Sequence, residues 1–420
     1  MSLQDAERLL LSRELFGMRF GLERMQRLLT ALGHPEQRFD SIHVVGTNGK
    51  SSTTRMTAAI LAAHGRRVGA YLSPHLVSFA ERIRIGDEDL EPQAFADAVQ
   101  RAVRAAELVE RSLDEGDRVT QFELLTAAAF SELARRGVEV AVIEAGLGGR
   151  YDATNVLPSR VQVLTGVGLE HTRWLGPTIT AIAREKLDVV RPGGTIVLGA
   201  GLHPDADAVA VEVAHARGAT IIRAGSEPGV AVGALGGFQR RNFALARAAA
   251  DAFLGALDPA AVAAAAAGVR VPGRLQIVDH DPLTLIDGAH NPDGIAAVAE
   301  SLPALMAGPP PRKRLVAVIS ILDDKDAAGM LANLIPVTDA LVFTASQNPR
   351  ALPPPTLQSL ASQVGARDTE LVRDPVAAVA RARELAGPDG LVLATGSIYL
   401  VGDLLAPVSD DARPRRASRL

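Results

Sequence analysis

Short apolar runs rich in β-branched residues alternate with longer amphipathic, alanine-rich stretches along most of the chain. The short runs have the length and composition of strands, and the longer stretches have the period of helices. The expected strands are residues 41–46, 139–145, 161–167, 195–200 and 219–225. The expected helices are residues 51–64, 92–110, 122–136, 178–190 and 242–257. The alternation predicts an α/β fold with a largely parallel sheet.

A second series of apolar runs follows the segment VRVPGRLQIVDHD, and each of its runs is again followed by a helical stretch. Its expected strands are residues 284–289, 315–320, 340–345 and 391–396. This series is long enough to form its own sheet, so we expect two domains, 1–280 and 281–420. The proline-rich segments 308–314 and 351–356 are expected to be turns, and the tail ARPRRASRL a frayed end.

Composition narrows the classes of protein to consider. A chain of 420 residues with 47% hydrophobic content can bury a large core, and a net charge of −4 gives no bulk attraction to nucleic acid or anionic membranes. The absence of cysteine excludes disulfides and cysteine-ligated metals. The amino terminus MSLQDAERLL is too charged for a secretory signal, and the longest apolar stretch is too short to span a bilayer. We expect a cytoplasmic, monomeric globular protein with no nucleic-acid or membrane partner.

Residues 42–54, IHVVGTNGKSSTT, have the pattern of a phosphate-binding loop between a strand and a helix. The glycines would let backbone N–H groups turn toward an anion at the helix amino terminus. Lys50 would reach the phosphates, and Ser51 or Ser52 would contact a magnesium ion. The usual spacing places a glycine at position 44, which is Val44, whereas Gly46 lies two residues later. The alternative is a glycine-rich turn that carries a surface lysine.

Glu144 ends a buried strand in VIEAGLGGRYDATN and is followed by glycines. The carboxyl edge of a parallel sheet is where α/β proteins bind ligands, and Mg²⁺ prefers hard anionic oxygens. The alternative is a solvated acid at the end of a strand. No histidine pair has zinc spacing and no strand–GxGxxG–helix unit is present, so neither a zinc site nor a dinucleotide cofactor is expected.

Only four of the 44 basic residues are lysine. Where lysine is retained, the position can require an ammonium group or an amine rather than a guanidinium. Lys50 lies in the candidate loop, and Lys186 lies in the helical stretch TAIAREKLDVV. For Lys186 the alternative is an ordinary helical lysine paired with Glu185.

Ten sequence blocks occur in a characteristic order between about residues 16 and 404. They are FGLERMQRLLTALGHP, IHVVGTNGKSS, YLSPHLVSFAERIRI, QFELLTAAAF, VIEAGLGGRYDATNV, LEHTRWLGPTITAIAREK, LIDGAHNPDG, ILDDKD, NPRAL and TGSIYLVGDLL. The short loop resembles that of the Mur ligase superfamily, and the ten blocks together resemble the folylpolyglutamate synthase/dihydrofolate synthase family. Ser51 departs from the glycine of most members, and LEH replaces a D-H pair found in many.

The resemblance implies a P-loop amino-terminal ATPase domain, a smaller Rossmann-like carboxyl-terminal domain and a cleft between them. It implies that ATP is bound by Asn48, Gly49, Lys50, Ser51, Ser52, Asn242, Arg274 and Asp287. It implies two Mg²⁺ ions, held by Ser52, Ser73, Glu144, His171 and a carbamylated Lys186; between the two serines of the loop, alignment favours Ser52. It implies substrate contacts from Phe122, Tyr151, Asp152, Ala153, His290 and Ser397, the last two holding glutamate. The residues assigned to catalysis are Lys50, Lys186 and His290.

The expected activity is ATP-dependent amide ligation. A substrate carboxylate would take the γ-phosphoryl group, and the amino group of L-glutamate would then displace phosphate. By resemblance the acceptor is dihydropteroate, a tetrahydrofolate or both. One alternative is a Mur-type ligase that acts on a nucleotide-linked sugar peptide. The other is a P-loop NTPase switch without ligase activity.

Overall fold

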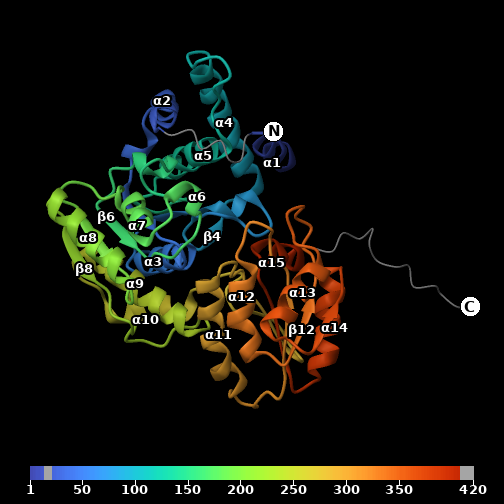
Figure 1. The fold of residues 1–420 in the computed structure, drawn as a ribbon. Helices are drawn as coiled ribbons and strands as arrows, with labels where there is room; N and C mark the ends of the chain where they lie inside the picture. Colours follow the sequence, from blue (N-terminus) through green and yellow to red (C-terminus); the bar gives the residue numbers. More distant parts are fainter. Residues whose placement is uncertain (14–20, 407–420) are drawn as a thin grey trace, which may run out of the picture. The chain divides into compact units, whose positions relative to one another are not determined.

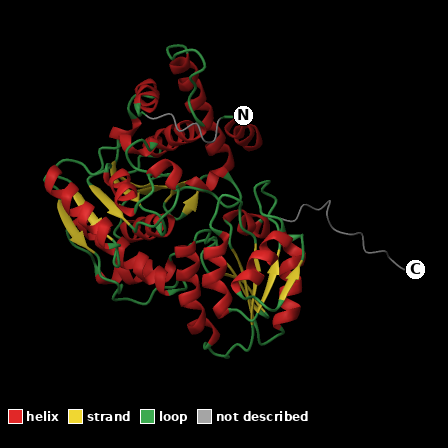
Figure 2. Cartoon of the chain, in the orientation of Figure 1, coloured by secondary structure: helices red, strands yellow, loops and turns green. Residues whose placement is uncertain are grey.

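The computed structural model describes residues 1–13 and 21–406. The chain divides into two compact units, Met1–Pro272 and Gly273–Leu420, each with its own sheet (Figure 1). Within each unit, helices flank the strands, as expected for an α/β protein (Figure 2). In the described ranges, no helix combines the length and the apolar character that crossing a membrane requires.

The first unit contains an eight-stranded sheet in the order β4-β3-β2-β5-β1-β6-β7-β8. Six neighbouring strands run parallel, in the spatial order β2, β5, β1, β6, β7 and β8. Strands β3 and β4 extend the β2 edge of the sheet in antiparallel pairing. Their bounds are β1 Asp40–Val45, β2 Val68–Tyr71, β3 Ile83–Ile85, β4 Glu88–Asp89, β5 Val140–Glu144, β6 Val161–Leu164, β7 Thr195–Leu198 and β8 Thr220–Arg223. Neighbouring β5, β1 and β6 therefore direct their carboxyl ends to one edge.

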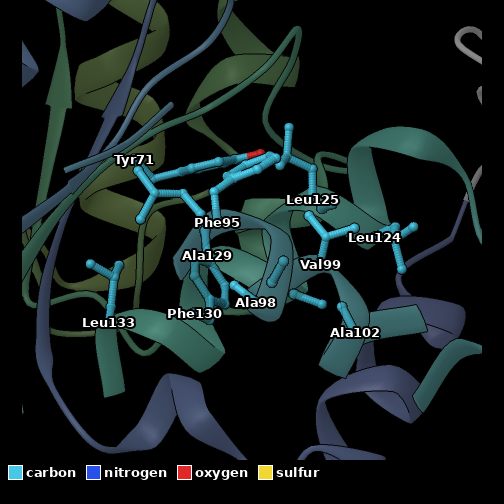
Figure 3. Packing of buried hydrophobic residues seen from close by; sticks show 14 of the residues in the cluster. Tyr71, Phe95, Ala98, Val99, Ala102, Leu124, Leu125, Ala129, Phe130 and Leu133 are labelled. Carbon is cyan, nitrogen blue, oxygen red and sulfur yellow. The ribbon is translucent and has the colours of Figure 1, made fainter. Parts of the chain in front are cut away.

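Helices cover both faces of this sheet. They are α1 Leu3–Ser12, α2 Glu23–Ala31, α3 Lys50–Ala63, α4 Pro92–Glu110, α5 Gln121–Arg135, α6 Thr172–Leu175, α7 Ile179–Leu187, α8 Pro204–Arg217, α9 Gly237–Leu254 and α10 Pro259–Gly268. One core lies beneath α1, α2, α4 and α5, where Tyr71, Phe95 and Phe130 are fully buried (Figure 3). A second core packs α3, α9 and α10 against the other face.

The second unit contains a six-stranded sheet in the order β13-β12-β11-β14-β10-β9. Its strands are β9 Gln276–His280, β10 Leu283–Ile286, β11 Leu315–Ile319, β12 Ala340–Phe343, β13 Thr369–Leu371 and β14 Leu391–Thr395. Its helices are α11 Pro292–Met306, α12 Ala327–Leu334, α13 Pro354–Val364, α14 Pro375–Ala386 and α15 Ile398–Leu405. Among the described strands of this unit, β9 alone pairs antiparallel with its neighbour.

The predicted α/β architecture is confirmed, and every strand expected in either series is present within a few residues. The division between the units falls after Pro272 rather than after residue 280, because β9 pairs with β10 and so belongs to the second sheet. Segment 351–356 is not wholly a turn, since α13 begins at Pro354. Proline is well tolerated in the first turn of a helix. The predicted frayed tail and the start of the FGLERM block lie outside the described residues.

Candidate nucleotide and metal site

The glycine-rich loop joins the end of β1 to the start of α3. Gly46 and Gly49 have φ angles of +149° and +85°, which favour glycine. A side chain on Gly46 would collide with the hydroxyl of Thr165, and a Cβ on Gly49 would lie 2.6 Å from Oδ1 of Asn242. The loop therefore fits closely between the end of β6 and helix α9, and the predicted ATP residue Asn242 lies beside it.

The first turn of α3 is open at its amino end. Among the described residues, no side chain caps it, whereas Thr120 and Glu123 form a capping box at the start of α5. The N–H groups of an uncapped first turn are available to an anion, and the helix dipole adds a partial positive charge there. The segment after β6 holds the loop in place, because Thr165 Oγ1 donates to the carbonyl of Asn48 at 2.6 Å.

Two lysines meet on one carbonyl of this loop. Lys50 Nζ donates to the carbonyls of Gly46 and Thr47, each at 3.1 Å. Lys186 Nζ donates to the same Gly46 carbonyl at 2.9 Å and to the carbonyl of Leu147 at 3.1 Å. Lys186, on α7, thus joins the phosphate loop to the glycine-rich loop that follows β5.

Lys186 is only 2% exposed. Burial and, secondarily, the positive charge of Lys50 lower the pKa of Lys186 to about 7. Gly149 brings α7 close, since a side chain there would collide with the backbone carbonyls of Glu185 and Lys186. The ordinary helical lysine paired with Glu185 is therefore not what the structure shows: Nζ contacts backbone carbonyls at the loop.

Glu144 lies at the predicted sheet edge, between two serine-bearing segments. Ser51 Oγ donates to one carboxylate oxygen at 2.9 Å, and the backbone N–H of Ser73 donates to the other at 3.0 Å. Ser52 is buried instead. Successive residues of an α-helix point about 100° apart, so only one of the two serines can face β5. Which serine would face a metal stays a prediction: the family alignment favours Ser52, whereas the contact with Glu144 favours Ser51.

His171 begins the short helix α6 with a left-handed backbone, φ +52°. Its Nε2 lies 3.8 Å from Oε1 of Glu170. The negative charge of Glu170 also partly opposes the lowering of the pKa of Lys186. Sequence reasoning did not name Glu170 as a site residue. The available signal was its position directly before His171, where a carboxylate can accompany an imidazole at a metal.

The residues fit Mg²⁺ that arrives with a nucleotide. Within residues 1–13 and 21–406, no group of three His, Asp or Glu side chains forms a preassembled metal centre. Mg²⁺ is commonly bound by one or two carboxylates, water and substrate phosphates rather than by a complete protein cage. The Glu144 carboxylate beside the Ser51 hydroxyl at the mouth of the loop supplies that kind of donor set.

The predicted pteridine-site residues differ in their exposure and in their contacts. Asp152 is buried and accepts from the N–H of Leu147 at 3.0 Å, so its carboxylate holds the glycine-rich loop. Phe122 packs with its ring centroid 6.1 Å from that of Tyr71. Tyr151 is 42% exposed, whereas Ala153 is buried. Of these residues, Tyr151 is the most exposed.

In the second unit, three predicted residues gather after β10. Asp287 is buried and accepts from the N–H groups of Leu275 and Ala289 at 2.8 and 2.7 Å. Burial raises the pKa of Asp287, while the nearby Arg274 opposes that shift. His290 contacts the carbonyl of Gly288 through Nδ1 at 2.8 Å.

Ser397 follows the neighbouring strand β14. It caps α15, since its hydroxyl accepts from the N–H of Tyr399 at 3.2 Å. The loops after β10 and β14 run alongside each other, because the N–H of Gly396 donates to the carbonyl of Ala289 at 3.1 Å. The structure therefore brings Ser397 to the same edge of this sheet as Asp287 and His290.

Comparison with known proteins defines the class. Residues 273–398 match the family described as Mur ligase, glutamate ligase domain. A phosphate loop beside a sheet-edge carboxylate, followed by such a domain, is the architecture of an ATP-dependent ligase of the Mur type.

The relatives are more specific. The chain is 36% identical over 386 residues to dihydrofolate synthase/folylpolyglutamate synthase of Mycobacterium tuberculosis, covering 82% of this chain and 78% of that one. It is 34% identical to folylpolyglutamate synthase of Lacticaseibacillus casei, covering 90% and 92%. This chain belongs to the dihydrofolate synthase/folylpolyglutamate synthase family of ATP-dependent ligases.

Solved structures agree with this assignment. Mycobacterium tuberculosis folylpolyglutamate synthase complexed with ADP and AMPPCP superposes with a TM-score of 0.88 at 33% identity, covering 96% of this chain and 97% of that one. The bifunctional synthase of Yersinia pestis complexed with AMPPNP and Mn superposes with a TM-score of 0.84 at 28% identity, covering 96% and 97%.

Proposed function

We propose that this ligase joins L-glutamate to the carboxylate of dihydropteroate, of a reduced folate, or of both. The observation that carries the proposal is the convergence of Lys50, Lys186 and Glu144 on the phosphate loop of a chain from this family. Family membership supports the substrate class, and the loop geometry supports phosphoryl transfer.

The reaction needs an activated acid, because a carboxylate does not react with amines at neutral pH. A carboxylate oxygen of the acceptor attacks the γ-phosphorus of ATP, and ADP leaves with the electrons of the broken P–O bond. The amine of glutamate then attacks the acyl carbon, loses a proton and expels inorganic phosphate. The protein's part is to position the reactants and neutralise charge. Lys50 and the N–H groups of the uncapped turn would contact the phosphates.

We propose two metal positions. Glu144 and Ser51, with Ser73 alongside, would hold one Mg²⁺. His171 and a carbamate formed on Lys186 would hold the other, with Glu170 as a nearby anion. Bound there, Mg²⁺ supplies charge neutralisation for the phosphoryl group in transfer.

The remaining contacts are assigned by family resemblance. By that resemblance, Asn242, Arg274 and Asp287 would contact ATP. His290 and Ser397 would hold the incoming glutamate. The pteridine would lie along Phe122 and Tyr151.

A product assay tests the proposal. Purified protein with ATP, Mg²⁺ and L-glutamate is given either dihydropteroate or tetrahydrofolate, and products are identified by mass. We expect acceptors extended by one or more glutamate residues, with stoichiometric ADP and phosphate. Reactions with D-glutamate or without ATP are the controls. No extended product from either acceptor would contradict the proposed function.

Glu144→Gln should lower turnover about 100-fold or more, because it keeps the shape but removes the negative charge that faces the metal. Raising Mg²⁺ should restore only part of the activity. The matched control is Glu139→Gln, which changes a half-exposed acid that bonds the N–H of Arg67 near the start of the same strand. Equal turnover and equal Mg²⁺ dependence in Glu144→Gln and the wild type would remove Glu144 from the metal site.

A further inference from the structure

A buried histidine lies on β1, close to the phosphate loop, and none of the proposed steps uses it. His43 is fully buried, and its Nε2 lies 2.8 Å from the hydroxyl oxygen of Thr154. That hydroxyl in turn donates to Oδ1 of Asp152 at 2.6 Å. Three polar side chains from β1 and the segment after β5 thus form one line inside the first unit.

The direction of each hydrogen bond follows from donor count. The backbone N–H and the hydroxyl of Thr154 both donate to Oδ1 of Asp152, so the single hydroxyl proton of Thr154 points at Asp152. The oxygen of Thr154 must then accept from His43, which places the ring proton of His43 on Nε2. Burial, with a smaller effect of Arg191, lowers the pKa of His43 to about 3, so the ring is a neutral donor. Its Nδ1 has no hydrogen-bond partner within the described part of the chain.

The line continues to the phosphate loop. The second carboxylate oxygen of Asp152 accepts from the N–H of Leu147 at 3.0 Å. The carbonyl of Leu147 accepts from Lys186 Nζ at 3.1 Å, and Lys186 also donates to the carbonyl of Gly46. These contacts therefore lead from His43 on β1 to Gly46, the residue directly after β1. They connect both ends of the path to the same strand, next to the phosphate loop.

We propose that His43 and Thr154 are positioning residues, which hold Asp152 so that the Leu147 peptide keeps Lys186 against the phosphate loop. The inference rests on the proposed function, since it concerns how that site is held together. A histidine suits the position because it supplies a directed N–H without adding charge beside Asp152. Valine in place of Thr154 would keep the shape but leave His43 Nε2–H without this partner. It would also remove the hydroxyl donor from Asp152 Oδ1, which keeps the backbone N–H of residue 154 at 3.1 Å.

Kinetics of three variants test the inference. Thr154→Val should lower kcat about 10-fold or more, as is common when a group that orients a site residue is lost. The KM values for ATP and for the acceptor should change little. Thr154→Ser, which keeps the hydroxyl, should recover most of kcat. The matched control is Thr284→Val in the second unit, because its buried hydroxyl donates to the nearby carbonyl of Pro282. The kcat of this variant should stay at the wild-type value.

A second measurement does not depend on catalysis. Nitrogen-15 NMR of histidine-labelled wild type should show a ring locked as the neutral Nε2–H form from about pH 5 to 8 that is absent in His43→Phe. His75, a half-buried ring that accepts from Arg82 at Nδ1, should give a second such signal that persists in His43→Phe. Wild-type kcat in Thr154→Val, or a His43 ring protonated on Nδ1, would overturn the inference. If the wild type makes no glutamyl product, the proposed function fails, and the NMR result alone decides the hydrogen-bond line. If Thr154→Val does not fold, the wild-type spectrum and Thr154→Ser decide it.

Discussion

Lys186→Ala should lose ligase activity by about 100-fold or more, and Lys186→Arg should be no better. The amine sits buried at the phosphate loop, where burial and Lys50 lower its pKa to about 7. An ordinary lysine stays protonated at neutral pH, but this one has a substantial neutral fraction that can add CO₂. Arginine cannot form the carbamate that would serve as an oxygen ligand.

Rescue and direct detection separate a carbamate from a purely cationic role. A short carboxylic acid should restore part of the activity of Lys186→Ala, and carbon-13 NMR with labelled bicarbonate should show a carbamate in the wild type only. The neutral fraction grows as pH rises through about 7, so CO₂-depleted enzyme should reactivate faster on the alkaline side. The control is Lys313→Ala, an exposed lysine paired with Asp389, which should stay active. Wild-type turnover in Lys186→Arg would contradict the carbamate.

Lys50→Ala should also reduce ligation by about 100-fold or more, while the protein remains folded. The side-chain nitrogen of Lys50 donates to the carbonyls of Gly46 and Thr47, within the phosphate loop itself. Lys50→Arg should fail as well, since a planar guanidinium does not replace a compact charge in so tight a loop.

The measurement for Lys50 is the steady-state rate together with ATP affinity and the melting temperature. Weaker ATP binding with an unchanged melting temperature supports the phosphate contact. Near wild-type turnover in Lys50→Arg would show that Lys50 does not hold a phosphate.

The sequence predicted the two α/β sheets because strands buried on both faces and amphipathic helices leave clear periodic patterns. It also indicated the sheet edge at which Lys50 and Glu144 meet. It could not decide between Ser51 and Ser52, because the choice depends on the rotational phase of α3, which the fixed loop before it determines.

Other parts of the site depend on contacts between residues far apart in the sequence. Asp152 looks like a free acid in its loop, yet its carboxylate is used by Leu147 and Thr154. His43 looks like one more residue of a buried strand, and its partner lies 111 positions away. These contacts form only when β1 pairs with β5 in the folded sheet, so no short stretch of sequence predicts them.

The closeness of α7 to the glycine-rich loop restricts how this chain can diverge. Because even a methyl group on Gly149 would meet the backbone of Glu185 and Lys186, a random mutation there would push the helix outward and withdraw the buried amine. The adjacent Arg150 is exposed, and its ion pairs with Glu185 at 3.9 Å and Asp188 at 3.5 Å are long surface pairs that contribute little. In a mutational scan, two successive codons should therefore show opposite tolerance: nearly every change depleted at 149 and most changes retained at 150.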